Sequence, residues 1–297
     1  MTIAIESEGT EDRSSARKRG PEIPRPFIKC VGGKGRLLKA LMRRVPEKFG
    51  RYHERFVGGG ALFWHLRREG RLSGGATLGD KDERLIRSYR AVRDVPDRVI
   101  ALLNNHQAEH SRAHYENVRK WSIDEGTDAE VAAWRIYLSK TAYNGLYRVA
   151  SNGRFNVPFG DYADPRILDE ANLRACSRAL QGVEILSGSF DARGAPWTDP
   201  SEGDLAFFDP PYAPVSPGAF VGYVSGGFGE EKQRALATQC RELKERGVHV
   251  IATNSDCDLV RELYPEPFWR VERREDRGNS VNRVASARGP VAELVIS

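Results

Sequence analysis

A short apolar run in the second half of the chain ends in a stiff polar turn. Leu205–Phe208 has the length and composition of a buried β-strand, and Asp209-Pro210-Pro211-Tyr212 follows it directly. In an open α/β sheet, ligands bind beyond the carboxyl ends of the strands. The tetrapeptide is therefore expected at a binding edge, and the plain alternative is a turn that only terminates a buried strand.

This turn has the chemistry to hold an amino group attached to an aromatic ring. The Asp209 carboxylate accepts one N–H, and the Pro210 carbonyl accepts a second, because proline fixes φ and so holds that carbonyl in place. Tyr212 offers a flat face on which a base stacks. We therefore take Asp209, Pro210, Pro211 and Tyr212 as the candidate catalytic residues.

Apolar runs alternate with helical patterns along the chain, which favours an α/β sheet. Residues 83–141 are mostly helical in pattern, and turn formers alternate with aromatics over 142–162, as in a loop with a hairpin. This helical block stands inside the α/β pattern as an insertion. The expected strands are 51–57, 76–80, 183–186, 205–208, 248–253 and 291–296, with an amphipathic helix over 236–246.

A second candidate site lies at Phe56–Gly60, between an expected strand and an expected helix. Its three glycines let a ligand approach the backbone near a helix N-terminus, although a flexible turn has the same composition. Asp80 lies 20 residues beyond Gly60, where an acid binds ribose hydroxyls in nucleotide-binding α/β units. Position 63 is Phe, which breaks the dinucleotide fingerprint and favours another adenosine-bearing cofactor over a nicotinamide.

Two further segments combine polar and aromatic residues. Pro26–Lys34 leads into a helical pattern and is no P-loop, because the spacing from Lys34 to a Ser or Thr is wrong; an ordinary loop is the alternative. In the segment 143–162, Asn144 and Arg148 are the residue types that read adenine and guanine edges. The alternative there is a purely structural hairpin.

Composition narrows the classes of protein that need considering. The net charge of +5 permits a polyanionic partner without establishing one. The four cysteines form no C-x-x-C pair, so neither a metal site nor a disulfide framework is expected, and reduced thiols fit a cytoplasmic protein. No run approaches the ~18 apolar residues of a membrane span. Residues 1–23 have the charge pattern of a disordered tail.

Taken in order, these motifs resemble the Dam-type (D12 class) DNA adenine N6-methyltransferases over residues 26–297. The family's P-F-x-K-x-x-G-G-K, F-x-G-x-G and D-P-P-Y match residues 26–34, 56–60 and 209–212. Its Y-N-G-L-x-R and F-N-V-P-F-G-x-Y match 143–148 and 155–162, and its S-N-x-D resembles 253–256. Cys30 replaces a frequent Trp, Arg55 the Pro of E-P-F, and Asp161 a basic residue of some members.

The resemblance implies a Rossmann-like S-adenosylmethionine-dependent methyltransferase sheet with an inserted helical target-recognition domain that carries a β-hairpin. The catalytic domain would comprise 24–83 and 171–297, and the recognition domain 84–170. The implied function is site-specific transfer of the methyl group of S-adenosyl-L-methionine to a flipped-out adenine in double-stranded DNA, within GATC or a related site. A cognate restriction enzyme is a candidate partner, and no membrane partner is expected.

The resemblance also assigns roles by matched position. Cofactor binding falls to Cys30, Lys34, Phe56, Gly58, Gly60, Asp80 and Asp209, and DNA binding to Lys29, Tyr143, Asn144, Leu146, Arg148, Pro158 and Tyr162. Three alternatives remain open: an N4-cytosine methyltransferase, which needs the same amino-group chemistry, RNA as the substrate, and a DNA-binding relative without catalysis. The intact D-P-P-Y and glycine loop argue against the last of these.

Overall fold

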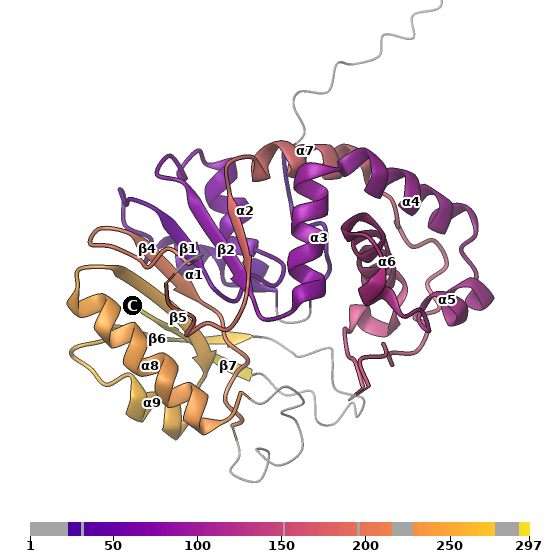
Figure 1. Ribbon diagram of the computed structural model, residues 1–297. Coiled ribbons are helices and arrows are strands. Elements are labelled where there is room, and N and C mark those ends of the chain that lie inside the picture. Colours follow the sequence, from indigo (N-terminus) through magenta and orange to yellow (C-terminus); the bar gives the residue numbers. More distant parts are fainter. Residues whose placement is uncertain (1–22, 31–32, 151, 195–196, 216–227, 277–290) are drawn as a thin grey trace, which may run out of the picture.

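The computed structural model describes residues 23–30, 33–150, 152–194, 197–215, 228–276 and 291–297. A seven-stranded sheet with the order β3-β2-β1-β4-β5-β7-β6 forms its centre (Figure 1). Neighbours from β3 through β5 are parallel, whereas β7 runs antiparallel to both β5 and β6. The strands are β1 Tyr52–Glu54, β2 Ala76–Asp80, β3 Glu184–Ser187, β4 Leu205–Phe208, β5 His249–Ser255, β6 Val271–Asp276 and β7 Val291–Ile296.

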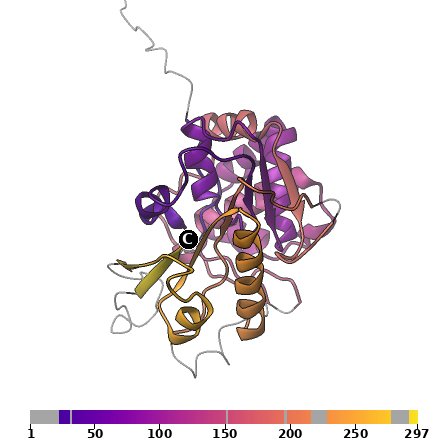
Figure 2. The same ribbon diagram turned by 90° about the vertical axis from the view of Figure 1, so that its left-hand side faces the viewer.

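Alternate residues of the central strands enter two separate apolar cores, as the two-residue period of a strand requires. In β4, Leu205 and Phe207 pack on one face of the sheet, and Ala206 and Phe208 pack on the other. Helices α1 Leu38–Met42, α2 Ala61–Arg68 and α3 Glu83–Asp94 cover the first face. Helices α8 Glu230–Glu245 and α9 Asp258–Leu263, orange to gold in Figure 2, cover the second.

The remaining helices lie on the α3 side of the molecule (Figure 1). Clear local signals start two of them: α4 has Pro96 at its first position, and α6 opens with a capping box between Thr127 and Glu130. Their buried residues, Trp134 among them, belong to the same apolar core as β1 and β2. These elements are α4 Pro96–Ala108, α5 Arg112–Val118, η2 Ile123–Glu125, α6 Asp128–Thr141, η3 Tyr143–Gly145 and α7 Glu170–Leu180. The short η1 Lys34–Arg36 lies instead beside α1 and α2.

The expected mixed α/β sheet is confirmed, with several changes of detail. The strand expected over 51–57 is shorter, because the backbone turns after Glu54. In place of the paired strands of a hairpin, two isolated antiparallel bridges, Ala142 with Phe159 and Val149 with Phe155, close the 142–162 segment. The expected tail lies outside the described residues except for Ile23. Within the described ranges, no helix is long and apolar enough to cross a bilayer.

Candidate active site

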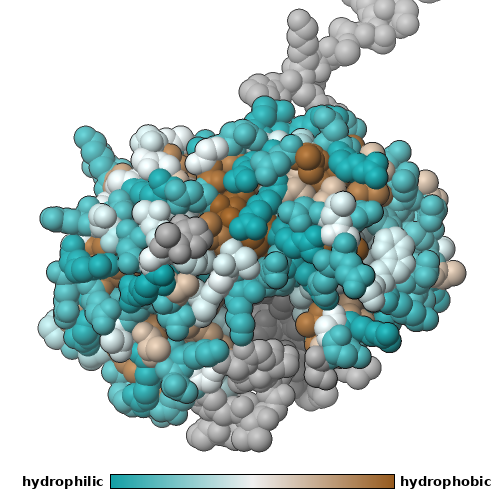
Figure 3. Space-filling model, viewed as in Figure 1, coloured by the Kyte–Doolittle hydropathy of each residue, from teal (hydrophilic) through white to brown (hydrophobic). Residues whose placement is uncertain are grey.

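A cleft of about 1250 Å³ opens at the carboxyl edge of the sheet. The molecular face in Figure 3 is hollowed below its centre. Single small-molecule sites usually measure about 300–1,000 Å³, so this cleft has room for more than one ligand group. Its lining brings together Lys29, Cys30, Lys34, Phe56, Gly58, Gly60, Asp80, Asp209, Pro210, Pro211 and Tyr212.

Asp209 directly follows β4, and two neighbours hold its carboxylate. Lys34 Nζ lies 2.9 Å from Asp209 Oδ1, and Thr253 Oγ1 donates a hydrogen bond of 2.6 Å to the same oxygen. Burial raises the pKa of Asp209, while Lys34 and Thr253 oppose that rise. The pairing with Lys34 therefore helps to keep a deeply placed carboxylate ionised.

Side chains from β5 and α8 hold the turn that carries Asp209 and Tyr212. Asn254 Oδ1 accepts a hydrogen bond of 2.9 Å from the Ala213 N–H. Gln233 Nε2 donates to the Pro211 carbonyl at 2.9 Å, and the Asn254 amide donates to Gln233 Oε1 at 2.9 Å. The turn is thus fixed by a connected amide network, in which Asn254 is the Asn of the S-N-x-D match at 253–256.

The glycine loop and Asp80 meet as the sequence predicts. Gly58 and Gly60 have φ values of 46° and 65°, in the left-handed region that favours glycine. The Gly58 N–H donates to Asp80 Oδ2 at 3.2 Å, and Tyr89 Oη donates to the Gly58 carbonyl at 3.1 Å. Burial raises the pKa of Asp80. A Cβ added at Gly58 would meet nothing within 4 Å, so the loop presents open backbone.

Two features of the cleft were missed from the sequence. Glu54, at the end of β1, is only 2% exposed and accepts a hydrogen bond of 2.9 Å from Tyr52 Oη. Burial raises the pKa of Glu54 well above its ordinary range. Phe190 stacks on Phe56 with ring centroids 5.5 Å apart, and Phe228 meets Phe56 edge to face at 5.6 Å. The only sequence signal was the acid that precedes Phe56, because Phe190 and Phe228 lie outside any motif.

Arg55, the residue that departs from the family's E-P-F pattern, holds the segment that carries Phe190 in this aromatic cluster. Its buried guanidinium donates to the Phe190 carbonyl at 2.9 Å and to the Ala192 carbonyl at 2.5 Å. Its Cζ also lies 4.7 Å from the Trp197 ring centroid. The departure thus ties the segment after β3 to the glycine loop, a connection that a proline side chain cannot make.

Of the residues matched to DNA binding, Lys29 lines the cleft and connects it to the 143–162 segment. Lys29 packs against Gly145, where an added Cβ would lie 2.5 Å from Lys29 Cδ, and its Nζ lies 5.7 Å from the Tyr162 ring centroid. The Tyr143 N–H donates to the Pro158 carbonyl at 2.9 Å. Asn144 takes a left-handed backbone, Leu146 packs on the core, and Arg148 Nε donates to Asn156 Oδ1 at 2.7 Å.

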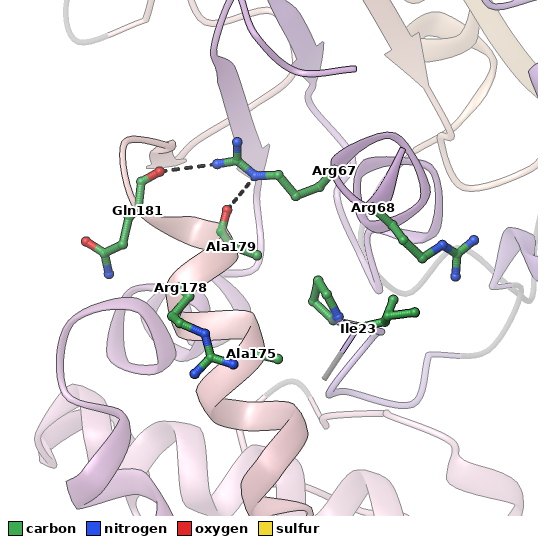
Figure 4. Close-up of a pocket in the computed structure, with 8 residues that line it drawn as sticks. Ile23, Arg67, Arg68, Ala175, Arg178, Ala179 and Gln181 are labelled. Atoms are coloured by element: carbon green, nitrogen blue, oxygen red, sulfur yellow. Dashed lines mark hydrogen bonds between the residues drawn. The ribbon is translucent and has the colours of Figure 1, made fainter. Parts of the chain in front are cut away.

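A second, shallower pocket lies between α2 and α7 (Figure 4). Arg67 donates to the carbonyls of Ala179 and Gln181, at the C-terminal end of α7, at 2.7 and 3.2 Å. Arg68 and Arg178 point away from this contact (Figure 4). The pocket is a packing contact between α2 and α7, because its arginine side chains do not point toward a common centre.

The four cysteines are all free thiols, and burial raises the pKa of Cys30 to about 11. Among the described residues, no group of three or more His, Cys, Asp or Glu side chains is arranged to hold a metal ion. Cys30 instead contributes packing, because its side chain lies against Gly59 in the cleft.

A methyltransferase of the α/β class is what this sheet and its cleft define. More narrowly, the chain belongs to the D12 class N6 adenine-specific DNA methyltransferase family, whose model matches residues 31–278. It is 36% identical over 281 residues to the type II methyltransferase M1.LlaDCHI of Lactococcus lactis subsp. cremoris, covering 92% of this chain and 95% of that one. It is 30% identical to a DNA adenine methylase of Vibrio cholerae, with 91% and 95% covered.

Proposed function

We propose that the chain transfers a methyl group from S-adenosyl-L-methionine to the N6 amino group of an adenine that has left the DNA duplex. The observation that carries this proposal is the position of Asp209. It lies at the carboxyl end of β4, ion-paired to Lys34, in the same cleft as the glycine loop and Asp80. One cleft thus holds an amino-group acceptor and an adenosine-binding loop.

The residues present fit the cofactor. The open backbone at Gly58 lets its adenosine part approach closely, and Asp80 is an acceptor for the ribose hydroxyls. The remaining contacts assigned by matched position are Cys30, Lys34, Phe56 and Asp209, all of which line the cleft. When bound, S-adenosylmethionine supplies an electrophilic methyl group on a sulfonium centre.

Asp209 and Pro210 prepare the nucleophile. The adenine amino nitrogen reacts poorly because its lone pair is delocalised into the ring. The Asp209 carboxylate and the Pro210 carbonyl accept hydrogen bonds from its two N–H groups, which favours sp³ geometry and stabilises the positive charge that develops on nitrogen. The methylated nitrogen then gives up one proton, and the methyl donor would leave as the neutral thioether S-adenosylhomocysteine. Lys34 and Thr253 both contact Oδ1 of Asp209, and we assign Oδ2 to the substrate. Positioning supplies roughly 7–11 kcal/mol of such barriers.

We further propose that residues 84–170 form the target-recognition domain, inserted between the catalytic parts 24–83 and 171–297. Support comes from Lys29, which lines the cleft and whose Nζ lies 5.7 Å from the ring centroid of Tyr162 in the segment matched to DNA binding. An adenine leaving the duplex costs a few kcal/mol, which stacking on Tyr212 offsets in part. The target is GATC or a site that contains it. Because the Lactococcus relative is named a type II methyltransferase, a cognate restriction enzyme is the proposed partner in the cell.

Nucleoside mass spectrometry tests the proposal. The protein is incubated separately with duplex DNA and with RNA in the presence of S-adenosylmethionine. We expect N6-methyladenine in the DNA alone. N4-methylcytosine in the DNA would show a cytosine enzyme with the same amino-group chemistry, methylation of the RNA would change the substrate class, and the absence of any product would indicate an inactive relative.

A further inference from the structure

A line of short contacts joins Asp80, in the cofactor cleft, to the segment matched to DNA reading. The Asp82 N–H donates to Asp80 Oδ1 at 3.0 Å, so the two acids share one tight turn after β2. Asp82 also caps α3, because its Oδ1 accepts a hydrogen bond of 3.2 Å from the Leu85 N–H. A displacement of the Asp80 turn is therefore also a displacement of the start of α3.

Arg135 extends this series of contacts from Asp82 to helix α6. It lies on α6, is only 4% exposed, and its Nη1 lies 2.6 Å from Asp82 Oδ2. The Nε of Arg135 has no hydrogen-bond partner among the described residues. Removing a guanidinium from water is unfavourable, and an apolar side chain often fills such a position with less loss of stability. A buried arginine here is therefore unexplained by packing alone.

The Arg135 guanidinium also packs against an aromatic ring. Arg135 Cζ lies 3.4 Å from the ring centroid of Tyr147, which stands between the proposed DNA contacts Leu146 and Arg148. Tyr147 also meets Phe155 at 5.6 Å between centroids, and Phe155 belongs to the bridge that closes the 142–162 segment. The ring thus links Arg135 to both limbs of that segment.

We propose that Arg135 is a positioning residue that couples occupation of the Asp80 site to the orientation of the DNA-reading segment. This inference rests on the proposed function, in which the cofactor contacts Asp80 and the 143–148 segment contacts DNA. Neither the ion pair nor the ring contact can lengthen without leaving a buried charge uncompensated. A ligand at Asp80 therefore favours one placement of Tyr147, and DNA held in that placement favours the ligand by the same factor.

The test measures that factor directly. S-adenosylhomocysteine, which cannot transfer a methyl group, is titrated into the full chain with and without a saturating duplex that carries the site found by methylation mapping. We expect the duplex to tighten its Kd by roughly 5-fold or more, in the usual range for coupled sites. The ratio of the Kd without duplex to the Kd with duplex should fall toward one in Arg135→Met and in Tyr147→Leu. Arg135→Lys should retain part of the effect, because it keeps the charge but loses the flat contact.

Arg67→Met is the matched control. It also removes an arginine that joins two helices, but it lies outside the line of contacts, so its ratio should equal that of the unmodified chain. Tyr147→Leu leaves the Asp82 ion pair in place and keeps the test valid if Arg135→Met does not fold. A ratio of one in the unmodified chain, or an unchanged ratio in both variants, overturns the proposal. Loss of methylation in the unmodified chain would instead defeat the proposed function, and this inference with it.

Discussion

The ammonium of Lys34 lies 2.9 Å from the carboxylate of Asp209. This pair joins the segment before α1 to the turn after β4, and it opposes the rise in the pKa of Asp209 that burial produces. The acceptor proposed for the adenine amino group is therefore kept ionised by a residue more than 170 positions away in the sequence.

Replacing Lys34 should move the pH dependence of methyl transfer. The ionised form of Asp209 is the one that accepts an N–H, so activity should fall as the pH drops through the pKa of this group. Lys34→Met removes the cation that lowers this pKa, and the acid limb of the kcat profile should move to higher pH. Lys34→Arg should keep the limb near its original position.

The measurement is kcat against pH at saturating cofactor, which separates the effect from any loss of cofactor affinity. Lys29→Met is the control from the same segment. Its Nζ faces Tyr162, so it should change the KM for DNA and leave the acid limb in place. An unmoved limb in Lys34→Met would contradict the role assigned to the pair.

Asp80→Ala should weaken cofactor binding. The carboxylate accepts the Gly58 N–H and is the proposed ribose acceptor. Hydrogen bonds to charged groups contribute roughly 1.5–3 kcal/mol, which corresponds to about a ten- to hundred-fold rise in Kd. Calorimetry with S-adenosylhomocysteine measures it, with the exposed Asp94→Asn on α3 as the control. Equal affinities for Asp80→Ala and the unmodified chain would reduce Asp80 to a structural acid.

Glu54 should make stability depend on pH. Its folded-state pKa lies above the unfolded value, so at low pH it is neutral in both states and folding carries no penalty. As the pH rises past the pKa that Glu54 has in the unfolded chain, Glu54 ionises in the unfolded state only. The free energy of unfolding therefore declines until the pH reaches the pKa of Glu54 in the folded state. The Gln side chain of Glu54→Gln stays neutral at every pH. The gain in free energy of unfolding of this variant over the unmodified chain should therefore be larger at about pH 8 than at about pH 5.

Denaturant unfolding at the two pH values checks this prediction. Glu47→Gln replaces an exposed acid and should give a difference that does not change with pH. The same result for Glu54→Gln would mean that Glu54 is not held neutral.

The target sequence is predicted to contain GATC, and Asp161 is its most informative position. The Asp161 carboxylate is 80% exposed, and Arg112 Nη2 lies 3.8 Å from it, with the Arg112 guanidinium 5.1 Å from the Phe159 ring centroid. A neighbouring cation offsets the repulsion between this acid and DNA phosphates. Asp161→Arg should therefore bind DNA more tightly at an unchanged site, and Arg112→Ala should bind it more weakly.

Methylation mapping of the unmodified chain beside both variants decides the matter. A changed outer base in Asp161→Arg would show that the acid reads a cytosine amino group instead. The absence of methylated adenine within GATC would refute the predicted target while leaving the chemistry intact.

The sequence predicted several central strands and the meeting of two motifs at one edge of the sheet, but it did not predict the periphery of the fold. The apolar runs at 76–80 and 291–296 became strands with those bounds, and the motifs at 56–60 and 209–212 meet in one cleft. Strand β6 was missed because its Glu-Arg-Arg-Glu-Asp run has no apolar alternation; Arg43 and Arg44 pair with Glu272 on it.

Side-chain contacts between residues far apart in the sequence were the other feature that could not be predicted. No local pattern indicates that Thr253 donates to Asp209, or that Gln233 supports Pro211, since these contacts depend on how the strands are ordered in the sheet. The same is true of Arg135, whose helical pattern marks it as one more position on a mostly buried helix. Its ion pair with Asp82 follows from the packing of α6 against α3.

Methyl transfer by Asp209→Ala tests the central claim most directly. Single-turnover methylation of duplex DNA is measured beside calorimetric binding of S-adenosylhomocysteine. We predict that binding stays measurable while the rate falls by at least the ~10²-fold seen when one preorganised charge-stabilising group is removed. Near-normal methylation of adenine by this variant would contradict the assignment of Asp209 as the acceptor for the amino group.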